Sequence, residues 1–332
     1  MVRANPAALL FLSLVLLCPA FAGEHIVLVT DPAFALGAMT RKAREKPPSV
    51  IRWKPGEEKP VWTVAEWHAK GDITDPAGRR KGAWDFKYED DYKTFVVNAK
   101  EPGADFIMGV NAINAYGGSY RGQGDPWPHL LVQQRISNPR GHLGASSPSM
   151  AQLQRIDFSC TVRLVRAKHV IEEGYIKNRH AAQFLIFFTV QNLNPQSPGR
   201  GDYLWFGICF YDSRHPVTKK HVMFDMGSEK KQGTGKLIYN VGMEPFTDKE
   251  IADGEWITVR GDLYPMMIQA LNEAWKRGAL PASRNLDDYY IGGMNLGWEV
   301  TGLSDVAMAV RDLSVVGEKR SQPAEVKDAG VY

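Results

Sequence analysis

The sequence predicts an all-β protein, an antiparallel β-sandwich with one packed amphipathic helix. From Trp84 onward the chain is made of short alternating or apolar runs separated by Gly, Pro, Asn and Asp, a pattern typical of antiparallel sheets with one buried face. One later segment breaks this pattern with apolar residues at helical spacing. The chain has 332 residues, 44% of them hydrophobic, which is enough for a sizeable core.

The first 22 residues have the features of a cleavable secretory signal peptide. Arg3 precedes an apolar run over residues 7–18, and small residues lead to a cleavage site after Ala22. Pro19 interrupts the run well before the roughly 20 apolar residues that a membrane anchor requires. We therefore expect a secreted or periplasmic protein that has no membrane contact after cleavage.

The remaining chain divides by composition into three parts. Residues 23–80 are charged and irregular apart from a strand-like segment over 26–30, which predicts an N-terminal extension. Residues 81–317 carry the sandwich pattern. Residues 318–332 are charged and poor in apolar side chains, so we expect a mobile tail.

Ten segments within the sandwich have the alternation and the flanking turn residues of strands. They cover residues 94–97, 105–112, 129–135, 155–166, 181–192, 202–212, 236–241, 256–260, 290–301 and 306–316.

The helix is predicted over residues 262–278. Asp262 is suited to the N-cap, and Pro265 falls in the first turn, where its missing N–H group costs little. Gly278 and Pro281 supply the stop.

Successive side chains of a strand point to opposite faces, so alternation separates a core face from a second face in three strands. In 202–212 the second face carries Tyr203, Trp205, Gly207, Cys209 and Tyr211. In 181–192 the second face carries Gln183, Thr189 and Gln191. In 290–301 it carries Asn295, Gly297, Glu299 and Thr301. If these strands share one sheet, they form a concave surface with a single carboxylate among aromatic and amide groups.

Such a surface is suited to a polysaccharide chain. Glu299 is the candidate for chemistry, because it stands between residues that are apolar or small. The candidate substrate-binding residues are Trp205, Tyr211, Asn295, Gln183 and Trp127, the last in a loop that also holds Tyr116 and Tyr120. The structural alternatives are a solvated Glu299 and aromatic rings that fill the core.

The C-terminal part also resembles glycoside hydrolase family 12, a family of secreted jelly-roll endoglucanases and xyloglucanases. The resemblance covers the run from Gly261 through the helix to Ser283, the strand Tyr290-Ile-Gly-Gly-Met-Asn-Leu-Gly-Trp-Glu-Val300 and the strand that follows Gly302. It implies a concanavalin-like jelly roll and places the acid/base glutamate at Glu299.

The resemblance fails at the nucleophile. Tyr203 stands where the family has its nucleophilic glutamate, and the strand 202–212 contains no Glu. A retaining glycosidase needs two carboxyl groups about 5 to 5.5 Å apart. Asp202 and Asp212 have the wrong parity unless a bulge changes it. The candidate catalytic set is therefore Glu299, Tyr203 and Asp212.

Two alternatives remain open. A polysaccharide lyase acting on a uronate-containing glycan would use Tyr203, Tyr211 or His180 as acid and base, with Arg179, Arg214 and Gln183 as neutralising groups. A non-catalytic, lectin-like carbohydrate-binding protein would need only the aromatic face.

Other functions lose support. Positive and negative residues nearly balance, and no basic block is interleaved with aromatic residues, so nucleic acid is not an expected partner. No phosphate-binding loop, zinc helix, paired Cys-x-x-Cys or serine-nucleophile motif is present, and we predict no cofactor or catalytic metal. Structural calcium at Glu89-Asp90-Asp91 or Asp287-Asp288 has no supporting motif. Parity places Cys160 and Cys209 on different faces, which argues against a disulfide.

Overall fold

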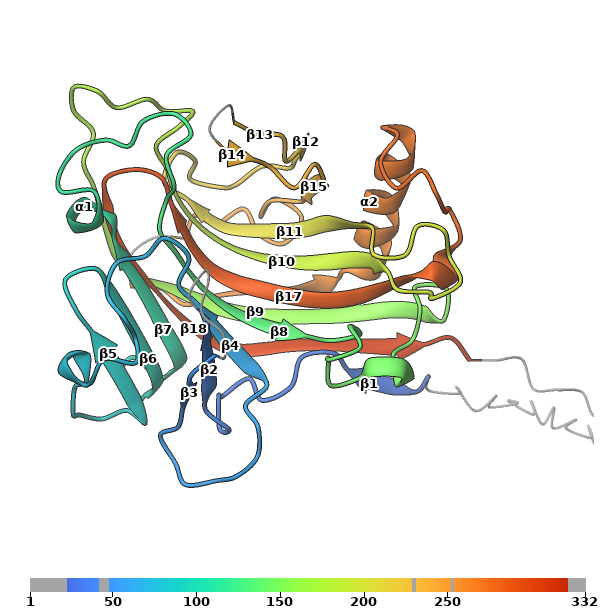
Figure 1. The fold of residues 1–332 in the computed structure, drawn as a ribbon, viewed down its shortest axis with the longest axis horizontal. Helices are drawn as coiled ribbons and strands as arrows, with labels where there is room; N and C mark the ends of the chain where they lie inside the picture. Colours follow the sequence, from blue (N-terminus) through green and yellow to red (C-terminus); the bar gives the residue numbers. More distant parts are fainter. Residues whose placement is uncertain (1–22, 42–47, 229–230, 252–253, 322–332) are drawn as a thin grey trace, which may run out of the picture.

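The computed structural model describes residues 23–41, 48–228, 231–251 and 254–321. The predicted signal peptide and residues 322–332 of the predicted tail lie outside these residues. The described part is mostly β-structure, with two sheets packed face to face as a sandwich (Figure 1). The predicted all-β sandwich class is confirmed.

The first sheet has the strand order β16-β9-β18-β7-β6-β5, with β1 paired to β18. Its strands are β1 (His25–Val27), β5 (Phe86–Glu89), β6 (Lys93–Ala99), β7 (Ala104–Asn111), β9 (Leu153–His169), β16 (Ile257–Asp262) and β18 (Ser304–Lys319).

The second sheet has the order β12-β15-β11-β10-β17-β8-β4-β2-β3. Its strands are β2 (Ala38–Arg41), β3 (Val50–Ile51), β4 (Trp62–Ala65), β8 (His129–Arg135), β10 (Ala182–Asn192), β11 (Tyr203–Asp212), β12 (His221–Phe224), β15 (Leu237–Asn240) and β17 (Tyr289–Val300). Its strands pair antiparallel, except that β11 with β15 and β2 with β4 are parallel. A separate small hairpin joins β13 (Gly227–Ser228) to β14 (Lys231–Gln232).

All ten predicted strands are present, with ends that shift by up to three residues. The N-terminal residues differ more from the prediction. Instead of forming a separate extension, residues 25–65 supply β1 to the first sheet and β2, β3 and β4 to the second. Strands of two to four residues are too short to show a clear alternation. At the other end β18 reaches Lys319, so the predicted tail begins inside a strand.

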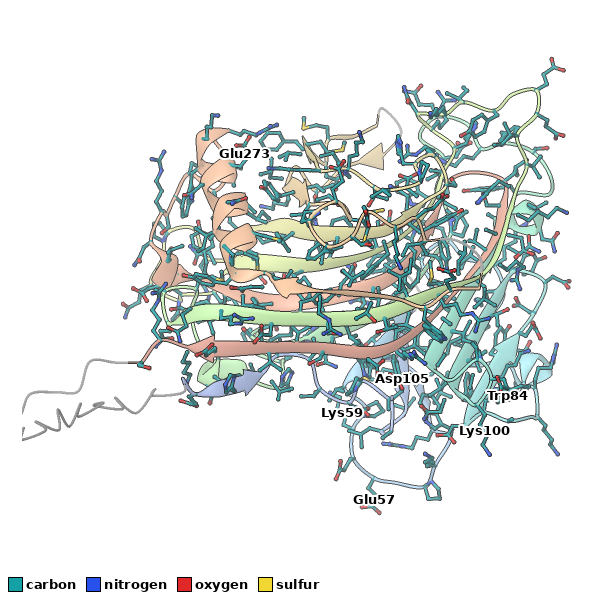
Figure 2. All side chains as sticks on the ribbon, turned by 180° about the vertical axis from the view of Figure 1, so that it is seen from behind. Glu57, Lys59, Trp84, Lys100, Asp105 and Glu273 are labelled. Atoms are coloured by element: carbon teal, nitrogen blue, oxygen red, sulfur yellow. The ribbon has the colours of Figure 1, made fainter. Side chains whose placement is uncertain are left out.

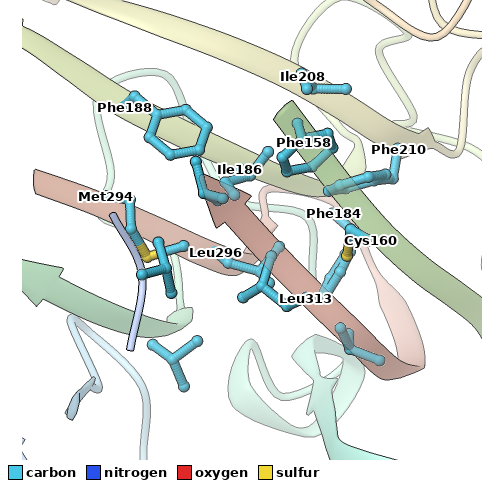
Figure 3. Close-up of a cluster of buried hydrophobic side chains, with 14 of the residues drawn as sticks. Phe158, Cys160, Phe184, Ile186, Phe188, Ile208, Phe210, Met294, Leu296 and Leu313 are labelled. Atoms are coloured by element: carbon cyan, nitrogen blue, oxygen red, sulfur yellow. The ribbon is translucent and has the colours of Figure 1, made fainter. Parts of the chain in front are cut away.

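The core lies between the two sheets and has the composition that alternation predicts. Phe184, Ile186 and Phe188 of β10 face the first sheet together with Leu296 of β17, and each is at most 4% exposed. Figure 3 shows them opposite Phe158 of β9. Full burial of a side chain of this size stabilises a fold by about 1.5 to 3 kcal/mol, so this layer is a main source of the sandwich's stability.

Helix α2 (Tyr264–Lys276) confirms the predicted amphipathic helix. It buries Met267, Ala270, Leu271 and Ala274 and contacts β9 of the first sheet and β11 of the second. The Asp262 side chain accepts a hydrogen bond from the backbone N–H of Tyr264 at 2.9 Å, although the helix begins later than predicted. Figure 2 shows Glu273 on the outer side of α2.

The other helical segments are single turns: α1 (Ala112–Ala115), η1 (Pro76–Gly78), η2 (Gly144–Ser146) and η3 (Leu286–Asp288). None of the helices in the described residues is long and apolar enough to cross a membrane.

Candidate functional site

A β-bulge in β11 decides which side chains reach the outer face of the second sheet, here called the groove face. Gln183 pairs with Asp212 and Phe184 with Tyr211, but Leu185 pairs with Cys209, so Phe210 is an extra residue. Before the bulge the groove face carries Trp205 and Cys209; after it, the groove face carries Asp212. The bulge thus places the Asp212 side chain on the groove face, which regular alternation from residue 203 would not do.

The same bulge moves Tyr211 to the core side, which corrects its predicted place on the groove face. Its ring packs against the buried Trp298 at 5.8 Å. Its hydroxyl lies 2.6 Å from Nε2 of His169, and Nδ1 of His169 lies 2.8 Å from the hydroxyl of Ser304. Burial lowers the pKa of His169. These contacts tie β11 to the adjoining ends of β9 and β18 in the first sheet and direct the Tyr211 side chain away from the groove face.

Four polar residues form one row across the groove face. Backbone pairing places Asp212 beside Gln183, Gln183 beside Glu299, and Glu299 beside His129. Neighbouring strands lie about 4.8 Å apart, so the Cα atoms of Asp212 and Glu299 are separated by roughly 10 Å. The row brings together two of the three predicted catalytic residues, with Gln183 between them.

Glu299 and His129 form a close pair within this row. The Nε2 atom of His129 lies 3.5 Å from Oε2 of Glu299, and the indole N–H of Trp127 donates to the same oxygen at 3.4 Å. The Nδ1 atom of His129 lies 2.9 Å from the carbonyl oxygen of Trp127. A carbonyl oxygen only accepts hydrogen bonds, so Nδ1 carries a proton.

This tautomer has a chemical consequence. In a neutral His129 the Nε2 atom then bears a lone pair that faces Oε2 of Glu299, and a carboxylate there would repel it. A proton on either Nε2 or Oε2 removes the repulsion. Nε2 of His129 and Oε2 of Glu299 thus face each other at 3.5 Å, a geometry suited to passing a proton between the two groups.

Aromatic side chains enclose the pair. The ring of His129 lies 5.3 Å from that of Trp127 and 5.8 Å from that of Trp67. The guanidinium group of Arg121 lies over the Trp127 ring, 5.1 Å from its centre. The Glu299 side chain stays 26% exposed, while that of His129 is 8% exposed. The glutamate is thus the member of the pair that a ligand can reach.

Asp212 is held as a carboxylate. Arg214 donates to it through Nε at 2.7 Å and through a terminal nitrogen at 2.5 Å, and the Gln183 amide donates at 2.8 Å. Burial alone would raise the pKa of Asp212, but the hydrogen bonds and charge of Arg214 outweigh burial and lower it. Asp212 in turn orients the Gln183 amide beside Glu299.

The third predicted catalytic residue, Tyr203, lies at the opposite end of the sheet. It pairs with Gln191, whose partner on β17 is Tyr290, nine residues before Glu299. At about 3.4 Å per residue this separation is roughly 30 Å. Burial raises the pKa of Tyr203, and its ring packs edge-on against Trp205 at 5.2 Å. Tyr203 and Glu299 cannot act on the same bond.

A groove of about 1000 Å³ lies on the groove face toward the Tyr203 end, and its described lining stops short of Glu299 and His129. Its floor includes Trp205, Thr189, Asn295 and Gln133, and residues of the β3–β4 loop and of the loop after β8 form its sides. Asn295 lies four residues before Glu299 on the same face, or about 14 Å along the strand. Two of the predicted substrate-binding residues, Trp205 and Asn295, therefore line the groove, and Gln183 and Trp127 lie at the Glu299 end.

His180, a candidate of the lyase alternative, has a structural place. Its Nδ1 accepts from the backbone N–H of Ile176 at 2.9 Å, and its Nε2 lies 3.1 Å from the carbonyl oxygen of Arg121. Both ring nitrogens are thus engaged by backbone groups, and the ring stacks on Tyr120. Arg179 bonds Gln123 at 3.2 Å at the surface.

No group of three or more His, Cys, Asp or Glu side chains in the described parts of the chain is placed to hold a metal ion. At the two predicted calcium positions Asp90 accepts from Tyr88 and from backbone N–H groups, and Asp288 accepts from Ser283 and Asn194. Cys160 and Cys209 are both buried and free, and burial raises the pKa of each thiol.

Sequence reasoning missed His129 and Trp67 as parts of the site and considered Arg214 only as a neutralising group of the lyase alternative. His129 opens a strand that continues with three apolar residues, and its role becomes visible only through its pairing with Glu299 across the sheet. The run Trp127-Pro128-His129, with two ring side chains around a proline, was the available signal.

Comparison with known proteins finds solved structures that are similar to this chain but no similar sequence family. No family model matches the chain, and no curated protein matches it. Among solved structures, a family 12 xyloglucanase from Bacillus licheniformis is 8% identical, covers 77% of this chain and 100% of its own, and has a TM-score of 0.41. The endoglucanase cel12A from Rhodothermus marinus is 10% identical, with coverage of 73% and 99% and a TM-score of 0.37.

A family 11 xylanase from Neocallimastix patriciarum is 11% identical, with coverage of 77% and 99% and a TM-score of 0.37. The resemblance to family 12 glycoside hydrolases that the sequence shows is thus found again, as a distant one. It assigns no role to any residue of this chain.

Proposed function

We propose that this protein binds a polysaccharide in the groove and cleaves it by hydrolysis, with proton transfer by the Glu299–His129 pair. The observation that carries the proposal is the 3.5 Å approach of Nε2 of His129 to the reachable carboxyl group of Glu299, on the same sheet face as the groove. Cleavage of a glycosidic bond requires a proton on the leaving oxygen. Glu299 would donate it, and His129 would return a proton to Glu299.

Asp212 is the candidate for the second carboxyl group. Its Cα separation from Glu299, roughly 10 Å, is closer to the 6.5 to 9.5 Å between the carboxyl groups of inverting enzymes than to the 5 to 5.5 Å of retaining ones. Arg214 keeps Asp212 ionised, as a residue that orients water must be. Gln183 lies between the two acids, where its amide can contact the sugar. Export from the cytoplasm, expected from residues 1–22, agrees with a polysaccharide substrate.

The test is Glu299→Gln, which keeps the shape of the side chain and removes its acid. Release of reducing ends from a panel of polysaccharides should fall by about 10² to 10⁴, while retention on the same insoluble polysaccharides stays unchanged. Glu57→Gln is the matched control, because Figure 2 shows Glu57 at the outer end of the β3–β4 loop. Turnover by Glu299→Gln at the rate of the natural protein would contradict the role of Glu299.

A lyase is the second candidate, because Arg214 already neutralises Asp212. Elimination needs one base and one acid together with groups that neutralise the uronate, and it does not need a second free carboxylate. His129 and Glu299 would then be the acid and base, in place of the distant Tyr203. New ultraviolet absorbance from an unsaturated product, lost in His129→Asn, would favour this reaction. Retention on a polysaccharide without products of either kind would leave a binding protein.

A further inference from the structure

The groove carries four positive charges from separate parts of the chain. Arg41 belongs to β2, Lys59 to the β3–β4 loop, Arg135 to the end of β8, and Arg140 to the loop after β8, and all four side chains are exposed. The pairing of β2 with β4 and of β4 with β8 brings these distant segments together. The whole chain has a formal net charge of only +3, so positive charge is concentrated in the groove.

Among the described residues of the groove lining, carboxylates that could balance these charges are absent. The groove's described lining contains no Asp or Glu, and its remaining polar side chains are amides, two threonine hydroxyls and one histidine. In the described residues none of the four cations forms an ion pair. In Figure 2, Glu57 lies at the outer end of the loop that holds Lys59. Four like charges around one groove repel each other, and an anion bound among them relieves that repulsion.

The charges also have a fixed place relative to Glu299. Arg135 pairs with Gly293, six residues before Glu299 on β17, or about 20 Å along the strand. Arg41 pairs with Ala65, Ala65 with Leu131, and Leu131 with Gly297. Arg41 is therefore in register with Gly297, three strands to the side of β17. A chain that runs from Glu299 along the sheet into the groove therefore presents its more distant units, about 20 Å from the linkage at Glu299, to Arg135.

We propose that the groove selects an anionic polysaccharide, one whose carboxylate or sulfate groups contact Arg41, Lys59, Arg135 and Arg140; this inference rests on the proposed function. Guanidinium groups bind carboxylate and sulfate oxygens through two parallel hydrogen bonds. Nucleic acid fits less well, because single strands are bound by a series of stacking rings, and Trp205 is the one Trp, Tyr or Phe in the described groove lining.

The experiment measures binding to polymer pairs that differ in charge. The pairs are polygalacturonate with its methyl ester, carboxymethylcellulose with hydroxyethylcellulose, and dextran sulfate with dextran; oligothymidylate is a further probe. The acidic member of at least one pair should bind at least tenfold more tightly than its neutral partner, and added salt should weaken that binding. Arg135→Gln/Arg140→Gln should reduce it about tenfold.

The matched control is Lys81→Gln/Lys100→Gln, which removes the same charge from exposed residues: Lys81 precedes β5, and Lys100 follows β6 in the first sheet (Figure 2). It should bind as the natural protein does, and thermal unfolding should be unchanged in both double variants.

Equal binding of neutral and acidic polymers, or an effect of the control as large as that of the arginine variant, would overturn the anionic inference and leave the proposed function standing. Tighter binding of oligothymidylate than of any acidic polysaccharide would overturn it in favour of nucleic acid. If no polysaccharide bound at all, both proposals would fail.

Discussion

Removal of Arg214 should destabilise the protein through the carboxylate that it leaves behind. In Arg214→Gln, Asp212 stays 5% exposed and loses two short hydrogen bonds from a guanidinium, at 2.7 and 2.5 Å. It keeps the Gln183 amide and the backbone N–H of residue 214. Removing one partner of a buried ion pair costs about 3 to 5 kcal/mol. The two donors that remain bonded to Asp212 reduce this cost, so we take the lower value of that range. We expect a loss of about 3 kcal/mol in the free energy of unfolding.

The loss should depend on pH. The folded protein lowers the pKa of Asp212, so its contribution is present above the unfolded pKa, about 3.9, and is lost as the pH falls through the lower folded value. Without Arg214, burial raises the pKa of Asp212, and the variant gains stability relative to the natural protein when Asp212 becomes protonated. The difference between the two proteins should therefore shrink between pH 7 and pH 3.

Urea unfolding followed by tryptophan fluorescence at several pH values measures this difference. Arg166→Gln is the control, because Arg166 pairs with Asp305 at 2.8 Å while 40% exposed. An exposed pair contributes at most about 1 kcal/mol. A loss below 1 kcal/mol in Arg214→Gln, or a loss that is constant with pH, would refute the role assigned to this ion pair.

Two further predictions concern residues near the site. Tyr211→Phe removes a hydroxyl 2.6 Å from His169 on the core side; it should cost about 1 kcal/mol of stability and leave polysaccharide binding unchanged. Weaker binding in that variant would contradict the placement of Tyr211 beneath the sheet. Cys160 and Cys209 are buried, at 0% and 2% exposure, so neither should react with a thiol reagent until the protein is unfolded, and both should react then. Rapid labelling of either residue in the folded protein would contradict this packing.

The long strands could be predicted from the sequence, because alternation over ten or more residues fixes which face is buried. Glu299, Asn295 and Trp205 were placed correctly for this reason. The prediction for Tyr211 failed at the bulge, since local alternation contains no signal for an extra residue. The positive groove could not be foreseen either: Arg41 and Arg135 are 94 positions apart in the sequence and meet only through a two-step strand pairing.

Phe210 acts as a phase shift in β11: residues before it and residues after it follow the same alternation, displaced by one position. The same residues in a regular strand, with Phe210 paired, would turn Asp212 toward the core and Tyr211 toward the groove face, so the acidic end of that face would become phenolic without a single substitution. A chain that lacks Phe210 would instead pair regularly and keep Asp212 on the groove face. When related chains are aligned, a one-residue gap at this position therefore preserves the chemistry of the groove face, whereas an unbroken alignment preserves it only where the bulge is kept.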